Sequence, residues 1–273
     1  MSILTSGEIL EALPKITSER QRFDLAAAMK AALEKACNRI FPSRISQATT
    51  ASGVTTITIP RHGLSVGNQV RLATGNTSSN WNGLFTVASV TGVDTFTIAL
   101  TPSGSLASVG EVTCRKVITE VQDTQGGSSF ACTNRPVSQV VSVEVSDSLN
   151  VLQAALDSSL VMLEEDTDGV SLTGIVWLKG VTLPTRAGKN WREGGRFPRG
   201  LRVKYVAGEP FVPADLLAAS KRAVAEMVKR EEQGGLTSES YDYYSYTMGT
   251  ADELSKHFGE LAMLIRSYRL PVI

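Results

Sequence analysis

Residues 7–41 carry apolar side chains at steps of three and four, which is the spacing of one helix face. Leu10 begins this stripe, and after a polar stretch it resumes at Phe23 and runs to about Phe41. Pro14 should interrupt the pattern, because proline lacks the amide hydrogen that a helix interior needs. The sequence therefore predicts a short helix followed by a longer one from about Ser18.

Helical spacing returns after residue 210. Pro213 is placed where a helix tolerates proline, in its first turn, and Gly234 with Gly235 should end that helix. Thr250 and Glu253 form a capping-box pair, which predicts the start of a last helix that Pro271 ends.

Between residues 45 and 115 the pattern changes to alternation of apolar and polar side chains, with hardly a charge. Four such runs are bounded by Gly, Asn or Asp turns: 55–59, 69–72, 84–87 and 95–98. Short strands at this spacing predict a small antiparallel barrel or sandwich. We interpret 45–115 as an all-β module inserted into a core formed by 1–44 and 116–273.

Strands are also predicted after the module. Alternating or β-branched runs occupy 117–121, 129–133 and 140–145, and a hairpin is predicted from 160 to 178 around the turn Asp166–Gly169. Residues 201–206 predict a closing strand.

Charge is balanced overall but divided locally. The 273 residues include 27 basic and 27 acidic side chains, whereas a compact reader of duplex DNA normally has a basic surplus. Residues 117–170 hold nine acids and one base, and residues 171–207 hold eight bases and one acid. Two such segments can pair within one subunit or between subunits.

The three cysteines, Cys37, Cys114 and Cys132, are odd in number and widely spaced. This favours buried free thiols in a reducing compartment over disulfides or a zinc site. The sequence has no apolar run long enough to cross a bilayer and no signal-peptide pattern at its start. We expect a protein of the bacterial cytoplasm or a virion part assembled there.

Groups that could carry chemistry are few. The two histidines, His62 and His257, are better explained by surface or packing roles than by catalysis. Glu164, Glu165, Asp166 and Asp168 match no calcium loop, so a solvated turn is the simpler interpretation. No nucleophile, phosphate-loop or zinc-protease motif is present. We therefore predict no enzyme activity, no cofactor and no metal.

A loop rich in Gly and Arg occupies residues 186–199 and is the strongest local peculiarity. It holds five bases, and among them Lys189, Arg192, Arg196 and Arg199 could contact DNA phosphates, or could dock on an acidic patch of a neighbouring subunit. We favour the subunit contact, because the whole chain has no basic surplus.

Several short motifs in order resemble the head–tail connector (adaptor) family of long-tailed double-stranded DNA phages. The match covers roughly 1–44 and 117–273. The motifs are Ala36-Cys37-Asn38-Arg39-Ile40-Phe41, Thr119-Glu120, Asn134-Arg135-Pro136-Val137, Val203-Lys204-Tyr205-Val206-Ala207-Gly208, Val212-Pro213-Ala214-Asp215-Leu216, and the ending with Arg230, Gly235, Ser238-Glu239-Ser240 and Tyr268-Arg269.

The resemblance implies an α+β fold: a helical bundle with a β-hairpin region, here with the module at 45–115 in place of a short loop. It implies a non-enzymatic virion protein that forms a ring, a dodecamer in the family, between the portal and the tail completion or terminator proteins. The ring would surround the DNA passage and touch the DNA without sequence preference. It also implies that the C-terminal segment Tyr268, Arg269, Leu270, Pro271 and Val272 docks on the portal. A frayed terminus remains the alternative for that segment.

A second interpretation remains open. The module, with its aromatic residue Trp81, also fits a phage tail protein that binds carbohydrate or the host surface. A wall hydrolase is a third interpretation, which the scarcity of partnered catalytic groups argues against.

Overall fold

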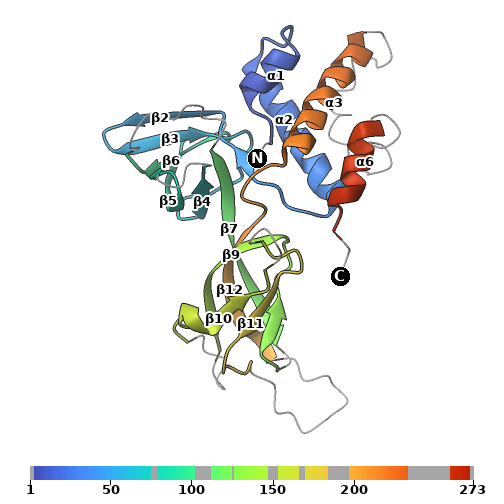
Figure 1. The fold of residues 1–273 in the computed structure, drawn as a ribbon. Coiled ribbons are helices and arrows are strands. Elements are labelled where there is room, and N and C mark those ends of the chain that lie inside the picture. The colour runs from blue at the N-terminus through green and yellow to red at the C-terminus, as the bar shows by residue number, and fades with distance from the viewer. Residues whose placement is uncertain are drawn as a thin grey trace. The chain divides into compact units, whose positions relative to one another are not determined.

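The computed structural model describes residues 3–74, 79–101, 112–124, 126–146, 153–165, 170–183, 197–232 and 259–270. These residues form two compact units (Figure 1). Unit 1 is built from Met1–Lys116 with Pro210–Ile273, and unit 2 from Val117–Glu209. Whether 45–115 is an independent inserted domain stays a prediction.

Unit 1 contains the helices of the described residues: α1 (Ser6–Ala12), α2 (Glu19–Cys37), α3 (Ala214–Glu232) and α6 (Gly259–Tyr268). The break predicted at Pro14 and the start predicted near Ser18 are confirmed. The Ser18 side chain accepts a hydrogen bond from the amide of Gln21 and so caps α2 at its N-terminus. At the other end Asn38 adopts the left-handed conformation that commonly ends a helix.

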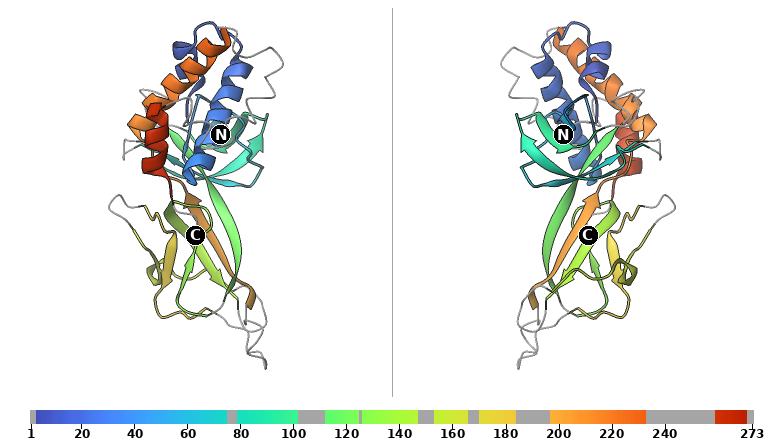
Figure 2. Two further views of the ribbon diagram at one scale, coloured as in Figure 1. Left: turned by 90° about the vertical axis from the view of Figure 1, so that its right-hand side faces the viewer. Right: turned by 90° about the vertical axis from the view of Figure 1, so that its left-hand side faces the viewer.

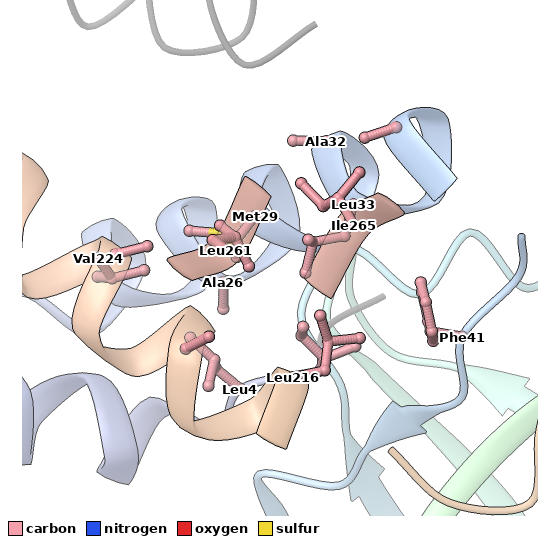
Figure 3. Close-up of a cluster of buried hydrophobic side chains, with 14 of the residues drawn as sticks. Leu4, Ala26, Met29, Ala32, Leu33, Phe41, Leu216, Val224, Leu261 and Ile265 are labelled. Atoms are coloured by element: carbon pink, nitrogen blue, oxygen red, sulfur yellow. The ribbon is translucent and has the colours of Figure 1, made fainter. Parts of the chain in front are cut away.

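These helices pack around one hydrophobic core, shown in Figure 3. Both views of Figure 2 show the helices from the two ends of the chain lying together. The buried alanines of α2 are covered by this core, and therefore by the subunit itself. The core includes Leu4 before α1, Ala26, Met29, Ala32 and Leu33 on α2, Leu216 and Val224 on α3, and Leu261 and Ile265 on α6.

The module in unit 1 is built from short antiparallel strands around a second core. The strands are β1 (Ser43–Arg44), β2 (Gln47–Ala51), β3 (Val54–Thr58), β4 (Gln69–Ala73), β5 (Gly83–Val90), β6 (Thr95–Ala99) and the beginning of β7 (Thr113–Thr124). β5 pairs with β4 through its first half and with β6 through its second half, with a register shift between Val87 and Ser89. The register shift lies where β5 changes its partner from β4 to β6, and such irregularities bend a strand.

Unit 2 is almost entirely β-structure. The later part of β7 pairs with β12 (Phe197–Ala207), and β12 pairs with β9 (Val137–Val145). A separate three-stranded sheet has the order β10 (Val161–Leu163), β11 (Ile175–Leu178) and β8 (Ser129–Ala131), with the short 3₁₀ turn η2 (Ser158–Leu160) before β10.

The predicted helical bundle with a β-hairpin region is wrong. The described part of the chain is mostly antiparallel sheet. One sheet has the order β2-β3-β6-β5-β4-β7-β12-β9, and the three-stranded sheet is separate from it. The reason is that the valine-rich strand β9 and the long strand β12 pair along most of their length and bury Val143 and Val203. Together with β7 they form a continuous antiparallel sheet, not a hairpin attached to a helical bundle.

Candidate functional site

One group of motif residues lies in contact at the ends of the helices in unit 1. The amide of Leu270 donates to the carbonyl of Cys37 over 2.9 Å, and the guanidinium of Arg39 donates to the carbonyl of Tyr268 over 3.4 Å. The Arg39 guanidinium also lies 5.7 Å from the centre of the Tyr268 ring, a cation–π distance. The Tyr268 hydroxyl donates to the Asp215 carboxylate over 2.9 Å. Three motifs far apart in sequence thus share one contact network.

A second group of motif residues meets in unit 2. The Tyr205 hydroxyl donates to Glu120 over 2.7 Å and accepts from both the amide and the side-chain nitrogen of Asn134 over 3.1 Å. Glu120 also accepts from the hydroxyl and the amide of Thr133 and from Gln122. Burial opposes the charge of Glu120, but these hydrogen bonds outweigh it and hold its pKa below the usual range. This network fixes the turn after β8 onto strands β7 and β12.

His62 is a packing residue. Its side chain is buried, and its ring packs edge-on against Phe96 with centroids 5.1 Å apart. Nδ1 accepts from the amide of Leu64 over 3.0 Å, while Nε2 lies 3.2 Å from the carbonyl of Gly92. A carbonyl can only accept, so Nε2 carries the proton and the ring is neutral. Burial lowers the pKa of His62 further. His257 lies outside the described residues.

The cysteine thiols are held protonated. All three cysteines are free and buried. Burial is the largest cause in each case, and it raises the pKa of Cys37 to about 11 and those of Cys114 and Cys132 to about 12. A thiol becomes a nucleophile only as a thiolate, so these side chains do not suit covalent chemistry at neutral pH.

Of the acidic residues at 164–168, only Glu164 and Glu165 are among the described residues. Glu164 and Glu165 are exposed, and Glu164 accepts from the hydroxyl of Thr173 over 2.8 Å. Asp166 and Asp168 lie outside the described residues. Among the residues that the structure describes, no group of three or more His, Cys, Asp or Glu could hold a metal ion.

The predicted portal-docking segment is partly integrated into unit 1. Leu270 is buried and bonded to Cys37, Tyr268 contacts Arg39, and Arg269 is exposed. Pro271 and Val272 lie outside the described residues. The docking role stays a prediction, and only Arg269 and the residues beyond Leu270 could serve it without loss of these contacts.

The predicted basic loop falls almost wholly outside the described residues. This applies to Lys189, Arg192 and Arg196. Arg199 belongs to β12, but its side chain is not among those described. The choice between DNA and a neighbouring subunit as its partner stays open.

Trp81 does not offer an exposed ring to a sugar, because only 2% of its surface is accessible. It belongs to the core of the module. The aromatic support for a carbohydrate-binding surface is therefore removed.

An exposed apolar pair in unit 2 was not predicted. Met162 on β10 and Trp177 on β11 are direct cross-strand neighbours, with 56% and 46% of their surfaces accessible. Glu164 follows β10 two residues after Met162, and Lys179 follows β11 two residues after Trp177, so an acid and a base lie just beyond opposite ends of this antiparallel pair. The signal was hidden, since Ile175–Leu178 is uniformly apolar and shows no alternation.

The helices that the structure describes include none with the length and apolar character needed to cross a membrane. Comparison of the chain with protein-family models and with curated proteins gave no match.

The Tyr205 network predicts a specific stability loss. Tyr205→Phe removes one donor from Glu120 and the shared acceptor of Asn134, so we expect the free energy of unfolding to fall by about 1–3 kcal/mol. Urea unfolding followed by circular dichroism measures it. Thr119→Val removes an exposed hydroxyl from β7 in a similar way and should change stability by less than about 0.5 kcal/mol. Equal stability of the two variants would contradict a structural role for the network.

His62 predicts a pH dependence of stability. Its pKa is lower in the folded protein than the ordinary value of 6.5, so the fold prefers the neutral ring. The contribution is fully present above that value and is lost as pH falls below it. Thermal unfolding of the wild type should therefore shift to lower temperature between about pH 7.5 and about pH 5.5. His62→Asn should flatten this slope and His257→Gln should keep it. A slope that survives His62→Asn would disprove the assignment.

Proposed function

We propose that this chain is a structural virion protein, the head–tail adaptor of a long-tailed phage. Its subunits form a closed ring, a dodecamer by the resemblance, which docks on the portal and receives the tail completion or terminator protein. The ring surrounds the DNA passage. The protein is assembled in the bacterial cytoplasm, takes its place in the neck of the virion, and has no enzyme activity.

The observation that carries the proposal is the convergence of the motif residues. Arg39, Tyr268 and Asp215 come from three separate motifs and share one network. Glu120 and Tyr205 come from two further motifs and meet Asn134 of another. Short motifs that match by chance have no reason to interact, whereas residues retained to hold one architecture do. The convergence supports reading the motifs as a set.

The states of His62 and of the three cysteines support a structural role over a catalytic one. His62 is neutral and spends both ring nitrogens on backbone groups. The raised pKa values of the cysteines keep them as thiols. These side chains are occupied inside the fold, and catalysis would need a nucleophile or base free to meet a substrate.

The apolar pair Met162–Trp177 is the surface that we assign to the subunit contact. Trp and Met are enriched at the centres of protein interfaces, and the exposed part of Trp177 alone amounts to roughly 100 Å². An acid, Glu164, follows one strand of the pair and a base, Lys179, follows the other, so this surface can meet a different surface of the next copy that carries complementary charges. Contacts of this head-to-tail kind close rings.

Two further roles remain part of the proposal. Pro271 and Val272, beyond the anchored Leu270, would dock on the portal. Lys189, Arg192, Arg196 and Arg199 would contact the acidic segment of the next subunit or DNA in the passage.

The proposed function predicts a complex with the portal. Purified protein mixed with the portal protein of the same phage should give rings stacked on the portal axis in negative-stain images, and native mass spectrometry should give the mass of portal plus ring. The portal alone is the control. A chain that leaves the portal bare and instead binds isolated host-surface glycans would favour the tail-protein alternative.

The contact surface is tested separately. In the double variant Met162→Thr and Trp177→Thr we expect loss of ring formation on the portal. Losing the buried half of Trp177 should lower the free energy of unfolding by about 1–3 kcal/mol, and circular dichroism should show that the variant still folds. Val66→Thr, at another exposed apolar residue with 64% of its surface accessible, should assemble normally. Rings formed by the double variant would place the subunit contact elsewhere and leave the proposed function intact.

A further inference from the structure

The helices and the module of unit 1 have separate hydrophobic cores. The helical core and the module core share no residue among those described. The polar contacts between the two parts gather in two places. We call them the root, at Ser43, Arg44 and Thr113, and the distal contact, at Arg20, Asp24, Arg61 and Asp94.

The root is buried and anchored by several elements. Lys30 of α2, with only 4% of its side chain accessible, donates to the hydroxyl of Ser43 over 2.9 Å. Arg44 pairs with Glu8 of α1 over 2.6 Å, and each of these side chains is 15% accessible. β1 also pairs with β7 at this place. Low exposure keeps these charges in a poorly screened environment, so the root holds over a wide range of salt.

The distal contact joins the start of α2 to two turns of the module. Arg20 lies 3.1 Å from Asp94 and 3.4 Å from Asp24. Arg61 lies 2.8 Å from Asp24, and its amide donates to Asp94 over 2.6 Å. Two ion pairs therefore cross from the helix to the module, Arg20 with Asp94 and Asp24 with Arg61.

The two places differ in solvent exposure. The side chains of Arg20, Asp24 and Arg61 are 54%, 41% and 55% accessible, and Asp94 is 15% accessible. Exposed ion pairs contribute little individually and weaken as salt screens them. In the part of the chain that the structure describes, no helix packs extensively along a module strand that could take over this task.

We propose that the distal contact is an ionic clamp, and that the module pivots about the root when salt opens it. When the clamp is closed, the module is held against α2 both at the clamp and at the root. When the clamp is open, the module stays attached at the root alone and samples other orientations. The ionic surroundings of the protein thereby set how rigidly the module is presented.

Distance measurements between spin labels test this directly. Lys35→Cys on α2 and Thr86→Cys on β5 introduce labelling sites at exposed positions, while the native cysteines are buried. At about 0.1 M salt we expect one narrow distance peak. At about 1 M salt, where the screening length falls from about 10 Å to about 3 Å, the peak should broaden and gain a shifted population.

Variants separate the clamp from a general salt effect. Asp24→Asn with Asp94→Asn should give the broad distribution already at low salt. Glu19→Gln neutralises an acid next to Arg20 that makes none of these contacts, and it should keep the narrow peak and its salt response. A distribution that neither salt nor the double variant changes would overturn the proposal. If the double variant does not fold, the salt series on the labelled protein with an intact clamp decides the question alone.

Discussion

The hydrogen bond from the amide of Leu270 to the carbonyl of Cys37 ties the end of α6 to the end of α2. Besides this junction, the helical part depends on packing in its shared core, because α1 and α6 are only 7 and 10 residues long. Helices of that length are marginal in water and gain their stability from packing. Each half of the helical core comes from one end of the sequence, so the core is complete only when both ends of the chain pack together.

Local signals in the sequence predicted the elements better than their assembly. Pro14 and Ser18 marked the break and the start of α2 because both act through their own backbone neighbours. The pairing of β12 with β7 and β9 could not be read in this way, since partners that far apart leave no periodic trace. The bundle prediction failed for that reason: it gave too little weight to long strands whose partners lay elsewhere.

The candidate sites show the same division. The resemblance selected Arg39, Glu120 and Tyr205 without indicating that each would bond a residue from another motif. The carbohydrate-binding interpretation would need an exposed Trp81, but this residue is in the module core, whereas Trp177 was part of an apolar run and is half exposed. Burial of a single aromatic residue depends on what covers it. Sequence pattern does not reveal that in a short strand.

β7 begins in unit 1 and continues into unit 2 as one uninterrupted strand. Its residues Thr113–Lys116 complete the module by pairing with β1 and β4, and its later residues pair with β12. A loop connection can be lengthened freely, but an extra residue inside a strand reverses the facing of every side chain that follows. Inserting or deleting one residue in the first part of β7 would therefore turn the side chains of the part that pairs with β12 to the opposite face, so unit 2 constrains the length of a strand that also completes the module.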